Sequence, residues 1–147
     1  MKKILAFTIL TLIFSCSNNN SSTSENASIQ ILGKWKLTSQ GSLINGVEQL
    51  HSPENAACNN AYDVNFIDAG VFQSILCNPY STPITSSTES GSWTITTLNN
   101  VSTLYIVYPS NTAQNTTCTI KQLDSQTLKL YTLFGNNINI ALYHKTQ

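Results

Sequence analysis

The side chains that could perform chemistry are few, and their spacing marks neither an active site nor a metal centre. His51 and His144 stand far apart in the chain, and the four cysteines include no Cys-x-x-Cys pair. Zinc sites usually take four ligands from such patterns. The seven acidic residues are scattered, and no Gly-x-Ser-x-Gly or His-x-x-x-His spacing occurs. We therefore expect no enzyme, no metal and no cofactor, although spacing alone does not reveal a site that the fold assembles.

Cys16 has the most informative surroundings of the four cysteines. Lys2 and Lys3 precede an apolar run over residues 4–14, which is too short for a membrane-spanning helix of about 20 residues but suits a secretory signal peptide. The run ends Ile13-Phe14-Ser15-Cys16, which resembles the lipobox of bacterial lipoproteins, although Phe14 replaces the usual smaller residue. The resemblance implies a diacylglycerol thioether on Cys16 and cleavage immediately before it. The alternative is an ordinary signal peptide followed by a chance cysteine.

These observations predict three segments. Residues 1–15 are the lipoprotein signal peptide, residues 16–28 are the lipidated cysteine and a disordered tether, and residues 29–147 are one folded domain. The tether reads SNNNSSTSENAS after Cys16, a composition that favours disorder, and such a coil spans about 20 Å. Lipoproteins often carry Asp after the lipidated cysteine when they stay in the inner membrane, so Ser17 resembles an outer-membrane destination. We expect a lipid-anchored protein of the cell envelope on the periplasmic face of the outer membrane.

The charge of the mature chain excludes one class of partner. Without Lys2 and Lys3, five lysines and no arginine remain against seven acidic residues, which gives a net charge of −2. Nucleic-acid binding requires clustered Lys and Arg to replace phosphate counterions. We therefore expect no nucleic-acid partner.

Apolar residues recur with a period of two along almost the whole domain, which is typical of β-strands. Short turns such as Asp68-Ala69-Gly70 separate the strands, which favours a meander closed into a barrel over a sandwich with long crossings. Residues 41–61 lack alternation and read as a long loop, with a possible helical turn over residues 53–57. Eight strands are predicted, over residues 34–38, 62–66, 71–76, 91–98, 103–108, 117–123, 127–134 and 137–144.

Two Gly-x-Trp segments suggest a family. Gly33-Lys34-Trp35 looks like the signature on the first strand of lipocalins, in which the indole plugs the closed end of the barrel. Cys58, a hairpin, Cys77 and then Gly91-Ser92-Trp93 follow in an order that resembles the small lipocalin-like lipoproteins of Bacteroidetes. The resemblance covers residues 29–147 and implies an all-β fold, an antiparallel eight-stranded meander barrel. It implies little about a ligand.

The same resemblance suggests a disulfide between Cys58 and Cys77, which flank the second and third predicted strands. The periplasm oxidises thiols, so one pair among three cysteines is expected, and Cys118 is then a free, buried, small apolar side chain. A bond between Cys77 and Cys118 is the competing arrangement.

Two non-enzymatic functions fit a barrel of this size. The first is binding of a small apolar ligand, with inward side chains as its lining. The second is a structural or interaction module that presents the loop over residues 41–61 to another envelope protein. The same inward side chains could instead fill the barrel, because eight strands leave little interior space. The candidate lining residues are Phe66, Ile75, Trp93, Ile106, Ile120, Leu130 and Ile140.

Replacing Cys16 by Ser tests the anchor. The lipid needs the thiol, so the Cys16→Ser chain is expected to leave the membrane fraction or keep its precursor size, as judged by fractionation and mass spectrometry. Cys118→Ser serves as the control and is expected to stay membrane-bound. If the Cys16→Ser chain has the same size as the processed wild-type protein and stays attached to the membrane, the lipobox interpretation is ruled out.

Overall fold

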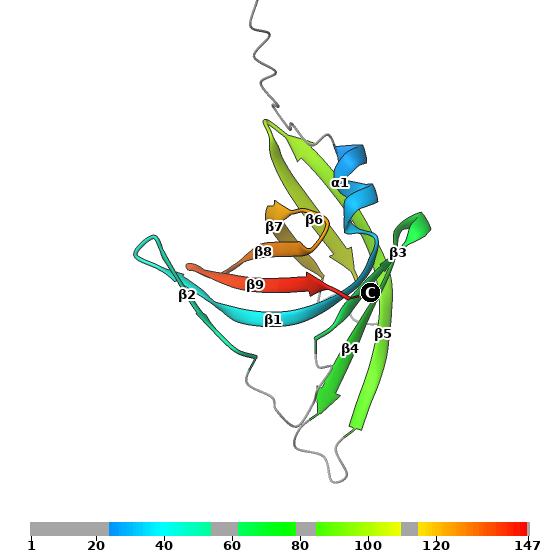
Figure 1. Ribbon diagram of the computed structural model, residues 1–147, viewed down its shortest axis with the longest axis horizontal. Helices are drawn as coiled ribbons and strands as arrows, with labels where there is room; N and C mark the ends of the chain where they lie inside the picture. Colours follow the sequence, from blue (N-terminus) through cyan, green and yellow to red (C-terminus); the bar gives the residue numbers. More distant parts are fainter. Residues whose placement is uncertain (1–23, 54–61, 79–84, 110–114, 147) are drawn as a thin grey trace, which may run out of the picture.

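The computed structural model describes residues 24–53, 62–78, 85–109 and 115–146, which form one α-helix and nine strands (Figure 1). In chain order the elements are α1 (Ser24–Ile31), β1 (Gly33–Ile44), β2 (Val47–His51), β3 (Val64–Ile67), a 3₁₀ turn η1 (Asp68–Gly70), β4 (Val71–Asn78), β5 (Thr85–Leu98), β6 (Val101–Val107), β7 (Thr116–Leu123), β8 (Thr127–Phe134) and β9 (Asn137–Lys145).

Eight of these strands form a closed antiparallel barrel. The sheet order is β2-β1-β3-β4-β5-β6-β7-β8-β9, and β1 also pairs with β9, which closes the ring of β1 and β3 to β9. Closure leaves no open edge in the ring. The prediction of an all-β, eight-stranded meander barrel is therefore confirmed, with β2 as an additional strand beside β1.

The predicted loop over residues 41–61 is wrong for its first half. β1 continues to Ile44, and a tight turn at Asn45 and Gly46 leads into β2, which pairs with β1 from Gln40↔His51 to Ile44↔Val47. Both turn residues have positive φ, 51° and 78°, and Asn-Gly is the dipeptide that such hairpins prefer. The alternation was missed because every residue of β2 is exposed. The possible helical turn at residues 53–57 lies almost wholly outside the described residues.

The folded domain begins earlier than residue 29. Residues 24–28, predicted to belong to the disordered tether, form most of α1. Ala27 and Ile31 stand four positions apart and share one helix face, and they are 2% and 0% exposed within the main core cluster. The helix packs against β5 and β7 and covers one end of the barrel (Figure 1). No helix among the described residues is long and apolar enough to cross a membrane.

Aromatic rings dominate the core at this covered end. Phe66 lies edge-on to Trp93, with ring centroids 5.7 Å apart, and is tilted against Phe72 at 5.3 Å. Phe66 and Phe72 are each 1% exposed. They face each other across the β3–β4 pair, whose predicted turn at residues 68–70 is confirmed.

The two Gly-x-Trp segments secure the same end of the barrel. The Trp35 indole N–H donates to the Ile31 carbonyl at 2.7 Å, and the Trp93 indole N–H donates to the Ile67 carbonyl at 3.1 Å. Gly91 is needed because a Cβ at this position would stand 2.3 Å from the Val107 carbonyl oxygen. Trp35 of the first segment therefore joins the barrel to α1 by a hydrogen bond. Gly91 of the second segment allows β5 and β6 to lie close together.

Removing the Trp35 indole N–H should destabilise the domain. Trp35→Phe leaves the Ile31 carbonyl buried without its donor, and an unpaired buried polar group costs about 1–3 kcal/mol. We expect the free energy of unfolding, measured in urea, to fall by about that amount. Trp93→Phe is the matched control, with a smaller expected loss because its bond is longer and less buried. Equal stability of wild type and Trp35→Phe would contradict this assignment.

Candidate functional site

Most of the predicted lining residues fill the covered half of the barrel. Phe66, Trp93, Ile106 and Leu130 are buried members of one core cluster, and Ile120 packs against it partly buried. Their side chains occupy the interior, so this half has the packed interior expected of a small barrel. The remaining candidates, Ile75 and Ile140, lie elsewhere.

Ile75 faces the outside of the barrel. Phe72 and Ser74 of the same strand are buried, and successive residues of a strand point to opposite faces, so Ile75 belongs to the outer face with Gln73. The segment VFQSIL carries apolar residues in both phases, which is why the sequence did not distinguish them. The prediction of Ile75 as an inner residue is wrong.

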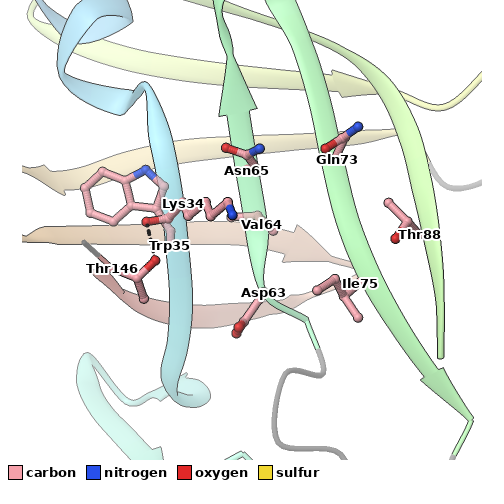
Figure 2. Close-up of a pocket in the computed structure, with 9 residues that line it drawn as sticks. All are labelled: Lys34, Trp35, Asp63, Val64, Asn65, Gln73, Ile75, Thr88 and Thr146. Carbon is pink, nitrogen blue, oxygen red and sulfur yellow. Dashed lines mark hydrogen bonds between the residues drawn. The ribbon is translucent and has the colours of Figure 1, made fainter.

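A groove of about 330 Å³ lies on this outer face across β1, β3, β4 and β5. Figure 2 shows Asn65 and Gln73 side by side on paired strands, with the Lys34 side chain extending toward β3. The Thr146 hydroxyl donates to the Lys34 carbonyl at 3.3 Å. The groove is lined by Lys34, Trp35, Asp63, Val64, Asn65, Gln73, Ile75, Thr88 and Thr146.

A second cavity, of about 360 Å³, lies on the inner side of the barrel beyond the packed core, where β1, β8 and β9 meet β2; we call it the mouth cavity. Its inner position follows from strand register, because Ala141 pairs with Leu130 and Tyr143 with Leu128, two buried core residues. The mouth cavity is lined by Leu37, Gln40, Gly41, Ser42, His51, Tyr62, Thr132, Asn139, Ile140, Ala141 and Tyr143. Ile140 also lines this cavity. It follows Asn139 in β9 and pairs with Tyr131, the neighbour of the inward Leu130, so its side chain is in the outward phase of the strand. The prediction of Ile140 as an inner residue is therefore wrong, although its side chain is buried.

The mouth opens because β1 changes partner on one edge. β1 pairs with β3 only from Gly33 to Trp35, and its pairing with β2 begins at Gln40. Between these stretches the Asp63 carboxylate accepts a hydrogen bond from the Leu37 N–H at 3.3 Å. Burial raises the pKa of Asp63, against the opposing effect of that bond.

Tyr62 stands beside this opening in a left-handed conformation with φ of 67°. Such a backbone is uncommon for a bulky residue and often occurs at functional positions. Its N–H donates to the Ile75 carbonyl at 2.9 Å, which fixes the segment against β4. The predicted strand over residues 62–66 includes Tyr62, whereas β3 begins at Val64, because the left-handed φ and the neighbours of Tyr62 follow from tertiary contacts.

Hydroxyl and thiol groups line the interior near the mouth cavity. Cys118, 3% exposed, carries a free thiol whose sulfur lies 3.2 Å from the Thr132 hydroxyl. Burial raises the pKa values of Cys118, Tyr108 and Tyr143. These groups stay neutral and able to donate hydrogen bonds at ordinary pH, so the inner wall is polar as well as apolar.

The cysteine predictions have different outcomes. The free thiol of Cys118 confirms its expected buried state and leaves no bond to Cys77 in this structure. Cys16, Cys58 and the Cys77 side chain lie outside the described residues, so the lipid anchor and the Cys58–Cys77 disulfide stay predictions. Among the described residues, no group of three or more His, Cys, Asp or Glu side chains could hold a metal ion.

Glu48 fastens the β1–β2 hairpin to β8. Its carboxylate pairs with Lys129 at 2.9 Å and accepts a hydrogen bond from the Tyr131 hydroxyl. The bond from Tyr131, followed by that from Lys129, lowers the pKa of Glu48. The Glu48 bond in turn raises the pKa of Tyr131 to about 12. Glu48 and Tyr131 are 83 residues apart in the sequence, and no sequence pattern indicates their contact.

Comparisons with known proteins identify a matching family and a solved structure of similar fold. A family model described as a lipocalin-like domain matches residues 31–130. A solved lipocalin-like protein from Bacteroides uniformis ATCC 8492 shares 13% identity and superposes with a TM-score of 0.52, covering 80% of this chain and 99% of its own. None of the curated proteins compared matches the chain. At 13% identity, this structural similarity shows a shared fold and nothing more.

Glu48→Gln should change the titration of Tyr131. Loss of the carboxylate removes the main cause of the raised pKa, so we expect it to fall from about 12 toward 10.0, measured by NMR of labelled tyrosine. The raised pKa of Tyr131 stabilises the fold below pH 10 and that contribution is lost as pH rises through about 12. Asp68→Asn, in the distant η1 turn, is the control and should leave Tyr131 unchanged. An unaltered Tyr131 pKa in Glu48→Gln would refute the contact.

Proposed function

The chain belongs to the family of lipocalin-like domains, and on that premise we propose that it binds a small amphipathic molecule in the mouth cavity while a lipid on Cys16 holds it to a membrane. The observation that carries the proposal is the mouth cavity itself. Its volume of about 360 Å³ falls within the range of about 300–1,000 Å³ typical of small-molecule sites. The helix-covered end is packed, so a ligand enters from the opposite end.

The lining favours an amphipathic ligand over a wholly apolar one. Leu37, Ala141 and the Tyr143 ring supply apolar surface, whereas Gln40 and Asn139 supply hydrogen-bonding groups. Polar groups in a binding site fix the orientation of a ligand, and their bonds are lost when the ligand lacks partners. The ligand therefore carries at least one polar group on a small apolar body.

The membrane anchor is supported by the lipobox resemblance and by the start of the folded domain. With α1 beginning at Ser24, the chain from Cys16 reaches at most about 28 Å, at roughly 3.5 Å per residue. Two or more acyl chains make such an attachment stable. The domain then works close to the membrane surface, in our proposal the periplasmic face of the outer membrane.

A second candidate function is supported by two hairpin tips. Ile44 and Val47 at the β1–β2 tip are 47% and 62% exposed, and Leu133 and Phe134 at the β8–β9 tip are 71% and 74% exposed. The tips are neighbours, because β9 pairs with both β1 and β8 at Ile138. Exposed apolar side chains of this kind mark protein contacts, so an interaction module is the alternative. Family membership favours binding over catalysis in both cases.

Ala141→Trp tests ligand binding at the mouth. The indole should occupy the mouth cavity and abolish binding of a neutral fluorescent lipid probe, measured by its emission on titration. Gln73→Trp adds the same side chain to the outer groove and is the matched control, with wild-type binding expected. Circular dichroism verifies that both variants fold.

The opposite result would relocate the site. Loss of binding in Gln73→Trp with normal binding in Ala141→Trp would assign the ligand to the outer groove. If the wild type binds no probe and a protein co-purifies from detergent extracts through the hairpin tips, the interaction module replaces ligand binding.

A further inference from the structure

Two buried polar atoms inside the barrel have no hydrogen-bond partner. They are Ser74 Oγ and Glu89 Oε2, and no other side-chain nitrogen or oxygen among the described residues shares this state. Buried polar groups are almost always satisfied, so each exception requires an explanation. An unpaired buried hydroxyl or carboxylate destabilises the empty protein.

The two atoms belong to one place. Ser74 on β4 pairs directly with Glu89 on β5, and paired residues lie on the same face of a sheet. That face is the inner one, because Ser74 is 5% exposed and Phe72 and Trp93, in phase with the pair, belong to the core. The two polar atoms without partners therefore lie on adjacent strands and form a single cluster.

An aromatic side chain adjoins this cluster. The Tyr108 ring stands edge-on to Phe72 with centroids 5.7 Å apart. After burial, Ser74 and Glu89 are the next strongest influences on the pKa of Tyr108, Ser74 lowering it and Glu89 raising it. The influence of Ser74 is that of a hydrogen-bonding group, so the Ser74 and Tyr108 hydroxyls are close to each other, but Ser74 Oγ makes no hydrogen bond of ordinary geometry. Tyr108 packs against the same core cluster as Tyr143, which lines the mouth cavity.

No described lysine neutralises Glu89. The one ion pair in the described part of the chain joins Lys129 to Glu48. Lys145 stands over the Trp35 ring and donates to the Gln30 carbonyl, and Lys121 stands over Tyr131. The inner wall thus presents a carboxylate without a cation.

We propose that Ser74 and Glu89 bind the ammonium head of an amphipathic amine whose apolar body lies in the barrel. The proposal rests on the proposed ligand-binding function and names the ligand class. A carboxylate only accepts hydrogen bonds, and an ammonium group offers three donors and a positive charge. The faces of Phe72 and Tyr108 favour cations over anions. A neutral alcohol would satisfy the acceptors more weakly, and a carboxylate ligand would be repelled.

Three probes with one tail and different heads test the head-group preference. Octylamine, 1-octanol and octanoate are titrated into the full-length chain in lipid nanodiscs, with empty nanodiscs subtracted, and binding is followed by the fluorescence of Trp35 and Trp93. We expect octylamine to bind about tenfold more tightly than octanol, as for one charge-assisted hydrogen bond, and octanoate to bind least.

Variants assign the preference to the cluster. Glu89→Gln should remove the advantage of octylamine over octanol, and Ser74→Ala should reduce it. Asp68→Asn and Ser90→Ala, exposed on the turn and on β5, are the matched controls and should keep the wild-type order. Without ligand, Glu89→Gln should unfold at a higher temperature than the wild type, because a neutral amide costs less than a carboxylate to hold at a buried position without a partner.

Each contrary result has a distinct meaning. Equal binding of octylamine and octanol, or an undiminished preference in Glu89→Gln, would overturn the amine site while leaving ligand binding intact. Failure of all three probes to bind would overturn the proposed function together with the amine site. Lower thermal stability of ligand-free Glu89→Gln would show that Glu89 has a structural partner and would also overturn the proposal.

Discussion

The pairing of β1 with three different strands is the constraint on which the rest of the barrel depends. On one edge β1 follows β9 from Trp35 to Leu43 and closes the ring. On the other edge it pairs first with β3 and later with β2. The first arrangement removes the open edge of the sheet, and the second separates β1 from β3 and creates the mouth. A closed, stable barrel and an accessible interior therefore come from the same strand.

The two halves of the interior differ because their neighbours differ. At the covered end α1 buries Ile31 against the sheet, and the Trp35 indole satisfies its carbonyl, so that aromatic rings pack without unpaired polar groups. Toward the mouth the inner wall carries hydroxyls, a thiol and the unpaired Ser74–Glu89 cluster. The packing that stabilises the domain is thus concentrated at the helix-covered end. The unpaired polar groups, which lower the stability of the domain, lie toward the mouth, where a bound ligand supplies hydrogen-bond partners.

Several local features were readable from the sequence, and others were not. The period of two and the turn at residues 68–70 predicted the strands and their meander, because these are local properties of the chain. The Asn45-Gly46 hairpin was also encoded locally, but the exposed residues of β2 concealed its alternation. The helix α1 was missed because its polar composition resembles a tether, and only contact with the barrel stabilises its single apolar face.

By itself, the sequence determined the class of fold, the antiparallel connections and the two Gly-x-Trp anchors, because alternation and turn residues act over a few positions. Only the tertiary structure decided which phase of β4 faces inward, since Val71 and Ile75 are as apolar as Phe72. It also decided that Ser74 meets Glu89 and that Glu48 meets Lys129. Ser74 and Glu89 meet through the register of β4 and β5. Glu48 and Lys129 lie on strands that do not pair, so only the position of the β1–β2 hairpin beside β8 brings them together.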